Sequence, residues 1–177
     1  MNYAVIFGAW WIVGMLCFLY SLRQPALSIC FYFFFASTPV LGYMMLCRFR
    51  NRVCGNNITF GRAYLFSLLT YFYAALLLAL ACYVYFRFFD HGEFISGYLK
   101  ALDSPEMKQA IKQESIRQLM GGAEIEDLKR VLESIQTVSP VVYAANILDI
   151  NIFIGFVLSV PAALLAARHR LRRRKQQ

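Results

Sequence analysis

The chain has 177 residues, of which 59% are hydrophobic and 16% aromatic, and its mean hydropathy is +0.51. A soluble domain of this size cannot bury so much apolar surface, so the composition argues for a membrane protein. The formal net charge of +8 would suit a protein that binds nucleic acid. No recognition motif or basic groove with interleaved aromatic residues accompanies that charge, so we expect no nucleic acid among the partners.

Four uncharged runs approach or exceed the roughly 18 to 20 residues that cross a hydrocarbon core. They lie at 2–22, 24–47, 63–86 and 150–167. With flanking residues included, we predict an all-α membrane protein with transmembrane helices at about 3–22, 25–47, 60–88 and 141–167, in one domain over 1–177. The first run is preceded by no Lys or Arg and followed by no A-x-A-like site, so we expect it to stay in the protein as a helix.

The first two helices carry the polar groups most in need of partners. Trp10 and Trp11 lie near the middle of the first helix, where we expect them to pack on another helix and each indole N–H to find an acceptor. Pro39 interrupts the second helix, and Ser37 and Thr38 beside it can bond the carbonyls that a proline frees. We predict a kink there and no binding site.

The fourth helix carries a stripe of small residues, one every four positions. The stripe consists of Gly155, Ser159, Ala163 and Ala167. Small residues at this spacing let a second helix approach closely, so we predict a packing face. Its neighbour is expected in the same chain, and a second copy stays open as the alternative.

Asp149 precedes this helix's uncharged run. It lies nineteen residues before Arg168, a helical distance of about 28 Å. That places it at the outer edge of the hydrocarbon core, where we expect a hydrated residue and not a working carboxylate.

The segment 94–138 is predicted to form an extracytoplasmic helical hairpin between the third and fourth transmembrane helices. Its first arm begins at Ser104 and Pro105, an N-cap followed by a favourable first helical residue, and stops at 121–122, where two glycines follow each other. Its second arm has one apolar stripe, formed by Ile125, Leu128, Leu132 and Ile135.

The charges predict the topology. All ten acidic residues lie between Asp90 and Asp149, whereas the loop after the second helix and the tail 168–177 are basic. Positive-inside counting therefore places both termini in the cytoplasm. We expect the basic residues to lie at the lipid head groups. These residues are Arg48, Arg50, Arg52, Arg62, Arg168, Arg170, Arg172, Arg173, Arg174 and Lys175.

Chemistry-bearing motifs are scarce in this sequence. No nucleophile elbow, phosphate-binding loop or HExxH pattern occurs. Asp90, His91 and Glu93 form at best a weak metal cluster, because three ligands on one turn lack a fourth. The five cysteines match neither a disulfide framework nor a zinc site. We therefore predict no catalytic residue, no cofactor and no metal.

Several stretches resemble one known family. They are "NNITFGRAYLFSL" with Thr59, Phe60 and Gly61, "YFRFFD", "LMGGAEIEDLKRVLES", and "FIGFVLSVPAALLAARHR" with Gly155 and Ser159. Over nearly its whole length the chain resembles the bacterial membrane family catalogued as domain of unknown function 4199. The resemblance implies four transmembrane helices in the inner membrane of a Gram-negative bacterium, with no established activity, cofactor or catalytic residue.

Three functions remain open on the sequence. The leading hypothesis is a non-enzymatic accessory or scaffold subunit of a membrane or envelope assembly, with membrane lipids and another membrane protein or a second copy as partners. The alternative is a small lipid or amphiphile transporter that holds an anionic head group on its basic residues. A lipid-acting enzyme built on Asp90, His91 and Glu93 is the least supported.

Overall fold

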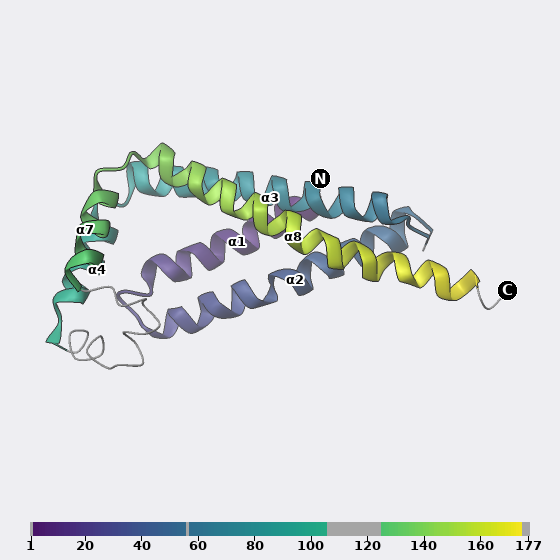
Figure 1. Ribbon diagram of the computed structural model, residues 1–177, viewed down its shortest axis with the longest axis horizontal. Helices are drawn as coiled ribbons and strands as arrows, with labels where there is room; N and C mark the ends of the chain where they lie inside the picture. The colour runs from purple at the N-terminus through teal and green to yellow at the C-terminus, as the bar shows by residue number, and fades with distance from the viewer. Residues whose placement is uncertain (1, 56, 106–124, 175–177) are drawn as a thin grey trace. The chain divides into compact units, whose positions relative to one another are not determined.

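Figure 1 shows the computed structural model, which describes residues 2–55, 57–105 and 125–174, and within them the side chains of 3–55, 57–105 and 125–167. The described chain is helical and contains no strand, as the sequence predicts. In chain order the helices are α1 (Asn2–Tyr20), α2 (Ala26–Val53), α3 (Phe60–Phe88), α4 (Glu93–Asp103), α7 (Ile125–Gln136) and α8 (Pro140–Arg174).

Contacts divide the chain into two compact units. The single membrane domain over 1–177 stays a prediction. The bundle unit contains Met1–Cys82 and Ala144–Gln177, and the insert unit contains Tyr83–Tyr143. The first boundary, after Cys82, falls inside α3, and the second, after Tyr143, falls inside α8. Each of these two helices therefore belongs partly to each unit.

Within the part of the chain that the structure describes, four helices are long and apolar enough to cross a membrane, which agrees with the number of spans predicted. The spans are Tyr3–Tyr20 in α1, Ala26–Val53 in α2, Phe60–Phe88 in α3 and Pro140–Ala167 in α8. Their outward faces are apolar, with Ile29 72% and Phe153 70% exposed. Side chains of this kind are stable on the outside of a bundle only when lipid covers them.

The helix α2 continues past its predicted end at 47 and stops at Val53. The prediction used the first charge, Arg48, as the limit of the apolar core, but a charge does not end a helix. Gly55 does so here, because its φ of +56° is a left-handed conformation that glycine adopts without steric cost. The amide of Cys54 closes the last turn by donating to the carbonyl of Arg50 at 3.2 Å.

The two tryptophans of α1 bond to two adjacent hydroxyls of α2, which confirms that their indole N–H groups have partners. Trp10 Nε1 donates to Ser37 Oγ at 3.1 Å, and Trp11 Nε1 donates to Thr38 Oγ1 at 3.2 Å. The rings of Trp10 and Phe34 also pack with their centroids 4.4 Å apart. These bonds join α1 and α2 where water is not available to replace them.

The hydroxyls beside Pro39 bond to a different carbonyl from the one that the proline frees. A proline at 39 leaves the carbonyl of Phe35 without its usual donor. Ser37 and Thr38 instead donate to the carbonyl of Phe34, at 2.8 and 3.1 Å. The reason is reach, since hydroxyls in a helix meet carbonyls three or four residues back. The helix α2 is continuous through Pro39, and a kink there stays a prediction.

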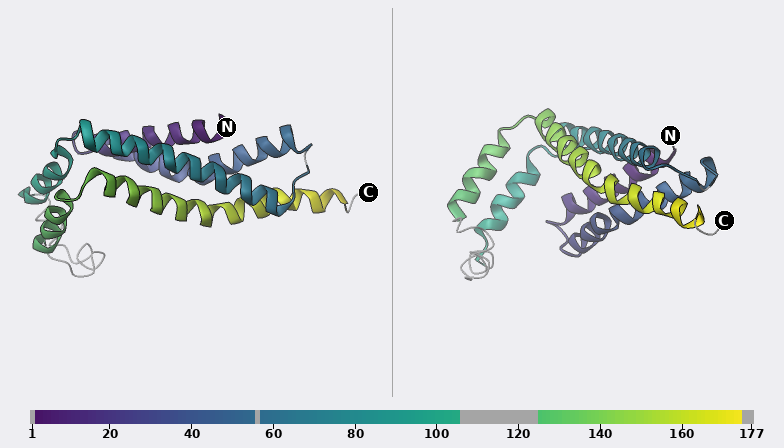
Figure 2. Two further views of the ribbon diagram at one scale, coloured as in Figure 1. Left: turned by 90° about the horizontal axis from the view of Figure 1, so that it is seen from above. Right: turned by 45° about the vertical axis from the view of Figure 1, so that its right-hand side comes forward.

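Tyr71 of α3 lies at the centre of the bundle unit, with 2% of its surface exposed. The Phe7 ring of α1 meets it edge-on, with centroids 5.0 Å apart, and Trp11 is the next ring beyond. Gly42 of α2 lies at its hydroxyl, and Gly155 of α8 lies at its Cβ. All four spanning helices therefore meet around this one side chain, and α8 runs alongside α3 in both views of Figure 2.

The insert unit contains α4 packed against α7, as Figures 1 and 2 also show. The apolar stripe predicted for α7 is half-buried along its length, at Ile125, Leu128, Leu132 and Ile135. The charged side chains off the stripe are exposed at Glu126, Asp127, Arg130 and Glu133. Lys129 joins the two helices, because its Nζ lies 2.6 Å from Asp103 Oδ1 of α4.

The helix that packs on α7 is α4. No separate arm is predicted from the sequence over the residues of α4. The first arm is predicted to run from Ser104 to 122. All of it after Pro105 lies outside the described residues, so this arm stays a prediction. The α4 helix ends just before it, where the Ser104 hydroxyl donates to the carbonyl of Ala101 at 2.7 Å. The hairpin topology of 94–138 is therefore open.

Candidate functional site

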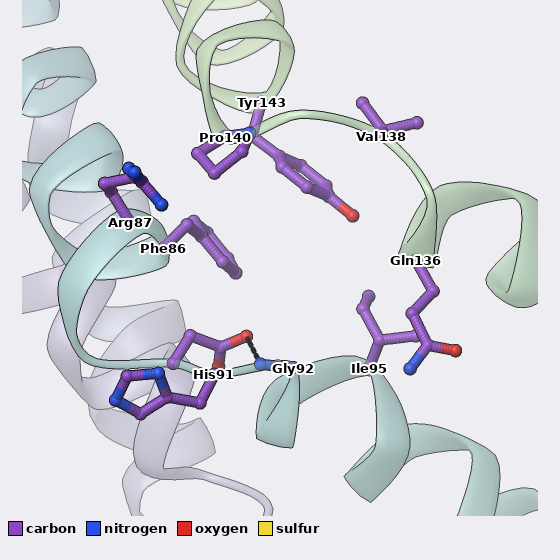
Figure 3. A pocket seen from close by; sticks show the side chains of 10 residues that line it. Phe86, Arg87, His91, Gly92, Ile95, Gln136, Val138, Pro140 and Tyr143 are labelled. Atoms are coloured by element: carbon purple, nitrogen blue, oxygen red, sulfur yellow. Dashed lines mark hydrogen bonds between the residues drawn. The ribbon is translucent and has the colours of Figure 1, made fainter.

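A hollow of about 290 Å³ lies in the insert unit, around the end of α3 and the start of α8 (Figure 3). The turn before α4, its first residues and the link after α7 complete the wall. The lining residues are Phe86, Arg87, Asp90, His91, Gly92, Ile95, Gln136, Val138, Pro140 and Tyr143.

Asp90 is buried, with 5% of its surface exposed, and it organises the turn that leads into α4. Its Oδ2 accepts from the Gly92 amide at 3.2 Å and its Oδ1 from the Phe94 amide at 3.0 Å. These are amides at the start of a helix, which have no carbonyl partner within the helix. The carboxylate therefore caps α4 with both of its oxygens.

The turn between Asp90 and α4 has an unusual backbone. His91 has a φ of +44° and Gly92 a φ of +82°. A left-handed conformation is uncommon for residues other than glycine, and the Asp90 carboxylate bonds hold it in place. His91 is exposed in this turn.

The opposite wall is aromatic. The rings of Phe86 and Tyr143 are stacked, with centroids 4.9 Å apart and planes at 16°, and both rings face the hollow in Figure 3. The Tyr143 hydroxyl donates to the carbonyl of Ile135, so the start of α8 is tied to the end of α7. The hollow thus has an aromatic wall on one side and the Asp90 carboxylate, which caps α4, on the other, with Arg87 at its edge.

The polar groups of this hollow are engaged with the backbone or exposed. The Asp90 oxygens are bonded to backbone amides, and His91 is exposed. Within the described residues, no three His, Cys, Asp or Glu side chains gather as metal ligands would. The cysteines among them, Cys17, Cys30, Cys47, Cys54 and Cys82, are all free thiols.

The basic residues at the end of α2 and the start of α3 separate into two kinds. Arg48, Arg52 and Arg62 are exposed, as a head-group contact requires. Arg50 is buried, with 8% of its surface exposed. The side chains of the remaining basic positions, Arg168, Arg170, Arg172, Arg173, Arg174 and Lys175, lie outside the described residues.

Arg50 joins α2 to α8. Its Nη1 donates to the carbonyl of Ala166 at 3.4 Å, and its Nε donates to Asn51 Oδ1 at 3.2 Å. From the sequence, Arg50 is predicted to be one of several head-group arginines. In the structure it is buried, whereas its neighbours Arg48 and Arg52 are exposed. Periodicity offers a signal in hindsight, because Arg50 lies four residues after Leu46, which is fully buried.

The small-residue stripe of α8 faces the interior of this chain. Gly155, Ser159 and Ala163 are buried and Ala167 is partly buried. A Cβ added at Gly155 would lie 2.6 Å from the Cβ of Tyr71, so no larger residue fits there. The stripe therefore lies against α3 at that level.

Comparison with known proteins places the chain in a family without supplying an activity. The model of a family described as "protein of unknown function (DUF4199)" matches residues 2–168. No curated protein matches the chain, and no solved structure matches it.

Proposed function

We propose a function for this chain, which belongs to the DUF4199 family of proteins of unknown function: it is a non-enzymatic accessory or scaffold subunit of a membrane or envelope assembly. Its bundle unit is the membrane anchor, and its insert unit is the part that meets the partner. The partner is another membrane protein.

The observation that carries this proposal is the use of polar groups inside the bundle unit. The indoles of Trp10 and Trp11 bond to hydroxyls of the neighbouring helix. Asn151 Nδ2 donates to the carbonyl of Ile147 at 2.7 Å. Polar groups at membrane depth commonly mark transport paths or intramembrane reaction sites. Here the indole bonds join two helices and the Asn151 bond stays within α8, which supports an anchoring role.

The orientation follows from the charges. The bundle unit holds Arg48, Arg50 and Arg52 at the end of α2, Arg62 at the start of α3 and the basic tail, whereas the acidic residues other than Asp149 belong to the insert unit. Positive-inside counting then places both termini in the cytoplasm and the insert unit outside, in a bacterial inner membrane.

The surface that meets the partner is the charged face of α7. Glu126 and Glu133 are exposed on this face. The bases nearby are already engaged, because Lys129 pairs with Asp103, and Arg130 lies 3.9 Å from Asp127. The face therefore presents negative charge, and the partner's contact surface is basic.

Site-specific photo-crosslinking in cells tests this surface. A photoreactive residue at Glu133 is expected to capture one protein, since this position is exposed, whereas the same residue at Leu132, which is half-buried on the α4 side, is expected to capture little. The same yield and pattern at both positions would contradict docking through this face. Capture of lipid alone at Glu133 would also contradict it.

The small-residue stripe gives no comparable test of docking. In a Gly155→Leu variant, the added side chain would collide with Tyr71 of the same chain. Loss of a partner in that variant would report a disturbed bundle and not a lost interface.

The alternative function, a small lipid or amphiphile transporter that handles an anionic head group, is favoured by one observation. Arg50 is a buried cation at the end of the bundle unit. A transporter requires release as well as binding, so movement of lipid by purified protein in vesicles would favour this alternative over the scaffold.

A further inference from the structure

The buried arginine of the bundle unit lacks a counter-charge from its own unit. Asp149 is the single acidic residue in the sequence of this unit, and it precedes Ala166 by seventeen residues of α8, which is about 25 Å along a helix. Arg50 bonds to the carbonyl of Ala166. Asp149 is therefore too far away to neutralise it.

The hydrogen bonds of Arg50 are also incomplete. A guanidinium has five N–H donors and remains charged at every physiological pH. In the described residues, Nε bonds to Asn51 and Nη1 bonds to Ala166 through a long contact of 3.4 Å, while Nη2 makes no bond and is accessible at the surface, where a ligand can reach it. A buried cation left in this state is unfavourable, so a bound anion is the expected complement.

The surroundings identify the class of anion. Arg50 and its partner Ala166 lie close to the ends of their candidate spans, which are at Val53 and Ala167, so the arginine lies near the end of the membrane-spanning part of the bundle. Head groups lie at this depth of a bilayer. Guanidinium N–H pairs match the oxygens of a phosphate in a two-bond geometry.

We propose that Arg50 is the centre of a binding site for the phosphate of one membrane lipid, at the end of the bundle unit where α2 meets α8. The exposed Arg48, Arg52 and Arg62 add positive charge nearby in sequence, and Arg50 supplies the specific contact. The site is independent of the proposed docking through α7, because it uses the bundle unit alone.

Native mass spectrometry of the full chain, released from mild detergent, tests the site. Phosphatidylglycerol, phosphatidylcholine and inorganic phosphate are added in separate arms. The wild-type protein is expected to retain one phospholipid per chain. Displacement of that lipid by inorganic phosphate would support an anion site at Arg50 but identify free phosphate as its ligand. If the protein retained neither lipid nor phosphate, the proposed site would be overturned.

Two variants and a matched control locate the binding. Arg50→Gln keeps an amide that can donate to Ala166 but removes the charge, so retention should fall by about tenfold or more, as expected for loss of a charge-assisted pair. Arg130→Gln removes the same charge from an exposed position of α7 in the insert unit and should change retention by less than about twofold. Equal retention in wild type and Arg50→Gln would overturn the proposal.

Arg50→Lys covers the case in which Arg50→Gln does not fold. A lysine keeps the charge but not the fork of parallel donors. We expect phosphatidylglycerol to raise the melting temperature of the wild-type protein clearly and that of Arg50→Lys by less. Equal lipid-dependent shifts in the two proteins would contradict a phosphate held by the guanidinium.

Discussion

Gly155 of α8 lies directly against Tyr71 of α3, so closely that a Cβ added at the glycine would be 2.6 Å from the Cβ of the tyrosine. The tyrosine is also held at its other end, where Gly42 of α2 lies against its hydroxyl. Both glycines are needed because a large ring occupies the middle of the bundle and the neighbouring backbones must pass close to it.

Gly155→Ala should destabilise the bundle unit by about 1 to 3 kcal/mol, because the added methyl group overpacks the contact with Tyr71. Gly61→Ala is the matched control, since nothing lies within 4 Å of a Cβ at that exposed position of α3. It should be neutral or stabilising by up to about 1 kcal/mol. Unfolding by denaturing detergent measures both, and equal effects would contradict the close contact.

The bond between Trp11 and Thr38 should be measurable as a coupling energy. In a double-mutant cycle with Trp11→Phe and Thr38→Val, we expect about 0.6 kcal/mol and at most about 1.7 kcal/mol, the range found for hydrogen bonds between helices in membranes. Additive effects of the two substitutions would show that the bond of 3.2 Å contributes nothing to stability.

Ser67 and Ser159 are buried hydroxyls that have no hydrogen-bond partner among the described residues. Removing an unpartnered buried hydroxyl relieves its desolvation cost, so Ser67→Ala and Ser159→Ala should be neutral or stabilising by about 1 to 3 kcal/mol. Thr70→Val is the control, because the Thr70 hydroxyl donates to the carbonyl of Phe66 at 2.8 Å. Destabilisation by either serine substitution as large as that of Thr70→Val would point to a water molecule between the helices.

Asp90→Ala should loosen the start of α4. It removes the acceptors of the Gly92 and Phe94 amides, and loss of a helix cap costs about 0.5 to 2 kcal/mol. Hydrogen exchange of both amides should accelerate, while His91→Gly should leave it unchanged or slower because glycine adopts the positive φ of 91 freely. Unaltered exchange in Asp90→Ala would contradict the cap.

The spans could be predicted from the sequence because each is a long uncharged run, and the stripe of α7 because its spacing fits a helix. The residues at which these helices end could not be predicted in the same way. The helix α2 ends at Val53, where Gly55 permits a left-handed turn, and not at the first charge. Charge marks where a membrane ends, whereas backbone conformation marks where a helix ends.

The central position of Tyr71 was not predictable from periodicity, and the one signal for the burial of Arg50 is its spacing of four residues from buried Leu46. Tyr71 is one of several aromatic residues in α3, and its position depends on glycines in two other helices. Arg48, Arg50 and Arg52 occupy every second position, and the contact of Arg50 with α8 is what distinguishes it from the other two. Asp90 did carry a signal, since an aspartate two residues before a glycine often caps the helix that follows.

The most direct test of the scaffold proposal is the ratio of partner to chain after purification at native expression level through a tag after Gln177. We predict one protein partner in a fixed ratio to the chain. It should be lost when Glu126→Lys and Glu133→Lys reverse the charge of the α7 face, and weakened less by the neutral pair Glu126→Gln and Glu133→Gln. A chain that purifies with lipid and no protein in a fixed ratio, or a partner that survives the charge reversal, would contradict the proposal.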